Sequence, residues 1–110
     1  MSDNYYFYLN ADHTFRPCTL DEWGSQIYEM KNNHSKHVAD EIINDCWVST
    51  VWMGINHQYF DGPPLLFETM VFKDGKSGDD IYMDRYSTWD EAEEGHKKAV
   101  QWVMDGCKDE

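Results

Sequence analysis

The chain has 110 residues and a formal net charge of -12, because 21 acidic side chains outnumber 9 lysines and arginines. Hydrophobic residues make up 41% of the chain and aromatic residues 15%, which suits a packed core and argues against disorder throughout. The acidic excess argues against direct binding to nucleic-acid phosphates or anionic membranes, and no apolar run approaches the roughly 18 residues of a membrane span. We therefore expect a single domain over residues 1–110.

The cysteines and the N-terminus both predict a cytoplasmic protein. Cys18, Cys46 and Cys107 are an odd number at wide spacing, without a C-x-x-C or zinc-ligand pattern. The first four residues lack the basic region of a secretory signal. We expect reduced thiols, no bound metal and no cofactor.

The first half of the chain predicts one strand and one helix. Aromatic residues at 5–9 favour a strand. Thr19 followed three residues later by Glu22 forms a capping box, and the apolar residues after it recur at helical spacing. We expect this helix to end near residues 31–33, and the pattern becomes typical of a strand from Val38 onward.

The second half predicts three strands and another helix. Aromatic and β-branched residues indicate strands at 47–55, 65–73 and 81–87. A second capping box, Thr88 with Glu91, begins the C-terminal helix. The expected order is β-α-β-β-β-α, an α+β fold with an antiparallel sheet of three to four strands and two helices on one face.

The predicted strands are apolar on both faces. In the first of the three, Trp47 and Val51 point one way while Val48 and Trp52 point the other. Two helices can cover one face, so the other would expose an apolar patch larger than monomers usually show. We expect a partner to cover that patch, either a second copy in a homodimer or another protein. The alternative is that the N-terminal strand and the 56–64 loop fold over it.

Two further features suggest a binding surface. Trp102 lies opposite the apolar face of the C-terminal helix, so we expect it near solvent, although a contact with the N-terminal strand would also explain it. Acidic side chains cluster between residues 79 and 94 and could compete for a basic site that otherwise binds phosphates, or could simply form a solvated surface. The predicted binding residues are Trp52, Asp79, Asp80, Asp90, Glu91, Glu93, Glu94 and Trp102.

The candidate polar site is built from residues in and beside the strands. Its members are His57, Glu68, Asp84 and Arg85. An unpaired carboxylate is costly to bury, so a metal or an acid–base pair could explain the two acids, as could pairing with Arg85 or a solvated position. His96, beside Gly95, is expected to be a hydrogen-bonded core histidine. No known catalytic motif occurs, so no catalytic residue is assigned and the sequence favours a protein that is not an enzyme.

Three segments resemble a family of short uncharacterised phage and prophage proteins. They contain Ser49-Thr50-Val51 with Gly54 and His57, then Gly62-Pro63-Pro64 followed by the apolar residues 65–72, then Arg85-Tyr86-Ser87-Thr88-Trp89 with Gly95-His96. In that family a strand ending in Gly and His precedes a Gly-Pro-Pro loop, and a Tyr-Ser-Thr segment begins a helix that contains Gly-His. The resemblance covers roughly residues 47–103. It implies a phage gene expressed in the bacterial host cytoplasm and no particular activity.

The leading hypothesis from the sequence is a non-enzymatic, phage-type accessory protein that binds a host protein with a basic surface. Such binding could inhibit host nucleic-acid or defence machinery. One alternative is a small enzyme or a ligand- or metal-binding domain that uses His57, Glu68, Asp84 and Arg85. Another is a minor virion or assembly component.

Overall fold

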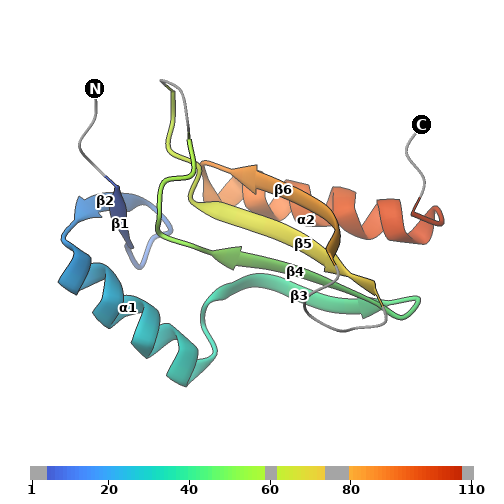
Figure 1. Ribbon diagram of the computed structural model, residues 1–110, viewed down its shortest axis with the longest axis horizontal. Helices are drawn as coiled ribbons and strands as arrows, with labels where there is room; N and C mark the ends of the chain where they lie inside the picture. The colour runs from blue at the N-terminus through green and yellow to red at the C-terminus, as the bar shows by residue number, and fades with distance from the viewer. Residues whose placement is uncertain (1–4, 59–61, 74–79, 108–110) are drawn as a thin grey trace.

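The computed structural model describes residues 5–58, 62–73 and 80–107, and within them the chain forms two antiparallel sheets and two helices (Figure 1). This arrangement confirms the predicted α+β class. The strands are β1 Tyr6–Leu9, β2 Phe15–Cys18, β3 His37–Ile43, β4 Cys46–Trp52, β5 Phe67–Phe72 and β6 Asp80–Tyr86. The helices are α1 Leu20–Asn33 and α2 Trp89–Met104.

Both helices begin at the predicted capping boxes. The Thr19 hydroxyl accepts a hydrogen bond from the Glu22 amide at 3.2 Å, and the Glu22 carboxylate accepts one from the Thr19 amide at 3.0 Å. Thr88 and Glu91 repeat this exchange, with both distances at 3.1 Å. Each box satisfies amides that the first helical turn would otherwise leave unpaired.

The main sheet has the strand order β3-β4-β5-β6, and α2 lies against one of its faces, behind the sheet in Figure 1. The alternation of side chains follows the prediction. Val48 and Val71 point toward α2 and pack there with Ala99 and Val103, whereas Trp47 points away. Since facing residues in antiparallel strands share a side of the sheet, the register identifies the residues of the uncovered side.

The smaller sheet is a hairpin of β1 and β2, and α1 packs on β1 rather than on the four-stranded sheet. We expected both helices on one face of a single sheet. The buried side chain of Gln26 explains the difference, because its amide bonds to both backbone groups of Leu9: the Leu9 amide donates to Oε1 at 2.9 Å and Nε2 donates to the Leu9 carbonyl at 2.8 Å. These two bonds attach α1 to β1.

The observed element order reads β-β-α-β-β-β-β-α and has two strands, β2 and β3, beyond the predicted order. β3 contains Val38, where the sequence pattern turns to strand, but it was not predicted as a strand separate from that at 47–55. The 1–110 boundary of the expected domain includes termini that lie outside the described residues. Among the described residues, neither helix has the length and apolar character needed to cross a membrane.

Candidate functional site

The side of the main sheet that faces away from α2, here called the open face, changes from apolar to polar along the strands. At one end Ile42 faces Trp47, which faces Phe72, and in the next row Met70 faces Met83. Ile42 is 72% exposed and Met83 is 48% exposed. Within the described part of the chain, no helix packs across this apolar end.

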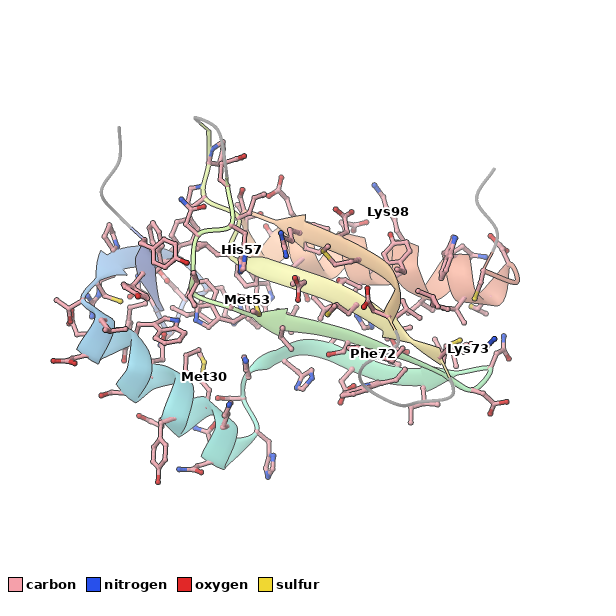
Figure 2. The ribbon with its side chains drawn as sticks, in the orientation of Figure 1. Met30, Met53, His57, Phe72, Lys73 and Lys98 are labelled. Atoms are coloured by element: carbon pink, nitrogen blue, oxygen red, sulfur yellow. The ribbon has the colours of Figure 1, made fainter. Side chains whose placement is uncertain are left out.

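The opposite end of the open face is polar. Glu68 faces Arg85 across β5 and β6, and its carboxylate accepts a hydrogen bond from the Arg85 guanidinium at 3.0 Å. Burial, together with the nearby charge of Arg85, lowers the pKa of His57, while Glu68 acts in the opposite direction. Figure 2 shows His57 beside the start of β5. The structure therefore brings together three of the four residues of the predicted polar site.

Asp84 is the exception and corrects the predicted site. It faces Thr69 across the β5–β6 pair, so it lies on the α2 side of the sheet, and its carboxylate accepts a hydrogen bond from the Arg85 amide at 2.9 Å. Adjacent residues in a strand point to opposite faces, so the side chain of Asp84 lies on the other face of the sheet from the Glu68–Arg85 pair.

Two further polar residues lie at this end, Lys36 and His37, and neither was predicted as a site residue. The His37 ring Nε2 lies 3.1 Å from the Ser49 hydroxyl, within hydrogen-bonding distance. Partial burial and, to a lesser extent, the charge of Lys31 lower the pKa of Lys36, whereas Glu68 raises it. These residues approach the sheet because the chain turns sharply after α1, where His34 adopts the left-handed conformation with a φ of 60°. No local sequence pattern shows that approach.

A groove of about 630 Å³ lies between the end of α1 and the open face. Figure 2 shows Met30 on α1 and Phe72 at the far end of β5, both of which line it. The remaining lining residues are Lys31, His34, Lys36, His37, Asp40, Trp47, Ser49, Val51, Glu68 and Met70. A larger hollow of about 840 Å³ is lined only by residues of α1 itself, so it is the outer surface of one helix and not a site.

Two of the residues predicted to bind a partner are placed differently from the expectation. Trp52 is 0% exposed and belongs to the core, so it cannot touch a partner in this fold. Trp102 is half-buried, and its ring centroid lies 5.0 Å from that of Tyr82 on β6. Trp102 therefore packs against the main sheet and not against the N-terminal strand.

The predicted acidic cluster is distributed over separate surfaces. Asp80 is exposed at the start of β6, and Asp79 lies outside the described residues. Glu91 accepts hydrogen bonds from the Ser87 and Thr88 amides, so its carboxylate takes part in the N-terminal cap of α2. The other members, Asp90, Glu93 and Glu94, are exposed on α2, and Glu94 pairs with Lys97 at 3.6 Å. Since α2 lies behind the sheet, these acids do not adjoin the apolar end of the open face.

His96 is a buried core histidine, as predicted, and it forms part of a hydrogen-bonded chain between α2 and the sheet. Its Nδ1 lies 2.7 Å from the Thr50 hydroxyl, and its Nε2 lies 2.7 Å from the Glu41 carboxylate. The Thr50 hydroxyl also lies 2.5 Å from that of Thr69. The carboxylate, the imidazole and the hydroxyl follow one another along this hydrogen-bonded chain in the order of a catalytic triad. However, Thr50 is 0% exposed, so no substrate can reach its hydroxyl, and the chain of bonds holds α2 on the sheet.

The described residues include no group of three or more His, Cys, Asp or Glu side chains placed to hold a metal ion. No protein-family description matches the chain, and the searches of curated proteins and of solved structures found no match either. The resemblance of residues 47–103 to short phage proteins therefore stays a prediction.

Proposed function

We propose that this protein acts by binding another protein through the apolar end of the open face. The observation that supports the proposal is the row formed by Ile42, Trp47 and Phe72, with Met83 beside it, on a face that no described helix covers. Ile42 and Met83 are exposed, and Trp47 and Phe72 are half-buried. Adjoining apolar groups that keep some contact with water gain free energy when a partner removes that contact.

The chemistry of the partner follows from the charge of this chain. Asp40, Asp45 and Asp80 are exposed near the apolar row, and the net charge is -12. Two copies would bring like charges together, which disfavours a homodimer. A partner with an apolar centre and a basic rim would complement both properties. The resemblance to phage proteins suggests, for this proposal, a bacterial host protein with a basic surface, such as one that handles nucleic acid.

A pair of matched substitutions tests the surface. Met83→Lys places a charge in the apolar patch, whereas Met104→Lys makes the same chemical change on α2, where Met104 is 60% exposed. The partner is first captured from bacterial cells with the wild-type chain and identified. It is then purified, and its affinity for each variant is measured by calorimetry.

We expect Met83→Lys to weaken binding by at least about tenfold and Met104→Lys to leave the affinity within about twofold of wild type. Equal affinities for the two variants would overturn the assignment of this face.

Light scattering of the isolated chain provides a second test. A dimer that Met83→Lys dissociates would mean that a second copy, and not a different protein, covers the face.

A further inference from the structure

The groove beside α1 brings lysines and histidines together in a strongly acidic molecule. In a chain of net charge -12, its lining contains Lys31, Lys36, His34 and His37. Among the described residues, no carboxylate lies within 4.0 Å of the ammonium group of Lys31 or of Lys36, the distance that defines an ion pair here. These lysines therefore keep their charge available to a ligand.

The two acidic residues of the groove already have partners. Glu68 is paired with Arg85 at 3.0 Å, and Asp40 accepts a hydrogen bond from the indole of Trp47. The negative end of the α1 dipole is also capped, since the His34 and Ser35 amides both bond to the Met30 carbonyl. The Trp47 indole is neutral, so Asp40 keeps its negative charge. Counted with Arg85, the three cations Lys31, Lys36 and Arg85 still outnumber the two acids by one, and the lowered pKa of Lys36 reflects both its burial and the neighbouring charge of Lys31.

The apolar part of the groove is aromatic. The ring centroids of Trp47 and Phe72 lie 5.1 Å apart, and Met70 lines the groove with them. Aromatic faces and a thioether are favourable surfaces for a flat ring. The volume of about 630 Å³ lies within the usual range of small-molecule sites, roughly 300–1,000 Å³.

We propose that this groove binds a small molecule that carries an anionic group on a planar aromatic ring system. The ring packs on Trp47 and Phe72, and the anion lies toward Lys31 and Lys36 at the α1 end. A phosphate on a nucleobase derivative and a carboxylate on an aromatic ring share this chemistry. The groove shares Trp47 and Phe72 with the proposed partner surface, but Lys31 and Lys36 lie outside that surface and the ligand is tested on the isolated chain, so the two proposals can fail separately.

Binding is tested by NMR titration of the isolated chain with two pairs of probes. The anionic probes are adenosine monophosphate and 1-naphthoate, and the neutral ones are adenosine and 1-naphthamide. We expect at least one anionic probe to shift the Trp47 indole signal and to bind about tenfold more tightly than its neutral counterpart. Binding of adenosine monophosphate alone would assign the site to nucleotides, and binding of both anions would assign it to the wider class.

Matched lysine substitutions locate the anion. Lys36→Gln, alone or with Lys31→Gln, should reduce the affinity for the anionic probe to that for the neutral one. Lys98→Gln removes the same charge from the exposed side of α2 and should leave the affinity unchanged. Thermal unfolding of each variant verifies that it is folded. Failure of both anionic probes to bind, equal binding of neutral probes, or an equal effect of Lys98→Gln would overturn the proposal.

Discussion

The Gly95-His96 pair in α2 has a packing role at both residues. A Cβ atom placed on Gly95 would lie 2.1 to 2.3 Å from the ring and hydroxyl atoms of Tyr86, so the Tyr86 side chain rests directly on the helix backbone. Burial there raises the pKa of Tyr86 to about 12. The next residue, His96, forms the buried bonds to Thr50 and Glu41. The pair thus fixes α2 to the sheet, which accounts for it without catalysis.

Replacing Gly95 tests that close approach. Gly95→Ala should lower the free energy of unfolding by about 1–3 kcal/mol, because the clash with Tyr86 outweighs the gain in helix propensity. Gly24→Ala is the matched control in α1, where an added Cβ would meet no atom within 4 Å. It should raise the free energy of unfolding by about 0.5–1 kcal/mol. Urea unfolding measures both, and a stabilising effect of Gly95→Ala would contradict the packing described here.

At the scale of elements, the helices could be predicted because their start signals are local. Each capping box occupies four consecutive residues, and its geometry is nearly independent of the rest of the chain. The strands β2 and β3 have no such signal. β2 contains Pro17 and has no buried residue, and β3 is an edge strand whose residues Asp40, Glu41 and Ile42 are exposed. Pairing with β1 and β4, which is a long-range interaction, determines both strands.

In the candidate site, too, local sequence signals predicted some residues, and long-range packing placed the others. Glu68 and Arg85 could be paired from the sequence because a buried carboxylate needs a cation. Asp84 was wrongly included, although strand alternation already placed it on the other face from Arg85. Lys31 and Lys36 could not be found, since they reach the groove through the packing of α1 beside the sheet, which depends on the bonds of Gln26 to Leu9.

The attachment of α2 through His96 gives a prediction at this scale. Thr50→Val should lower the free energy of unfolding by about 1–3 kcal/mol, because it leaves the buried His96 Nδ1 and Thr69 hydroxyl without the Thr50 hydroxyl. Glu41→Gln should have a smaller effect, within about 0.5 kcal/mol, since half of the Glu41 side chain is exposed. Denaturant unfolding gives both values, and hydrogen exchange of the α2 amides shows whether the helix loosens first.

A double substitution provides the control for that prediction. Thr50→Val combined with Thr69→Val removes both facing hydroxyls, so the combined loss should be smaller than the sum of the two single losses. Strict additivity would mean that the two hydroxyls do not interact in the folded protein.

Across the whole molecule, charge is unevenly distributed. Exposed acids lie on α2 and, as Asp40, Asp45 and Asp80, near the apolar row of the open face, whereas Lys31 and Lys36 lie at the α1 end of that face. The net charge of -12 is a sum over the whole chain, so it does not reveal where the charges lie. The proposed anion site rests on this uneven distribution, since the groove contains lysines although the chain as a whole is acidic.

The net charge leads to a prediction for the isolated chain. Because its charges mostly repel one another, raising the salt from 0.01 M to 0.1 M, which shortens the Debye length from about 30 Å to about 10 Å, should raise the melting temperature. At 0.01 M salt, light scattering should show a monomer, because two chains of charge -12 repel each other most strongly at the low end of this range. Any self-association through Ile42 and Met83 should therefore appear only as salt increases. A stable dimer at 0.01 M would mean that apolar contact between copies outweighs this repulsion, and the partner surface would then belong to a second copy of the chain.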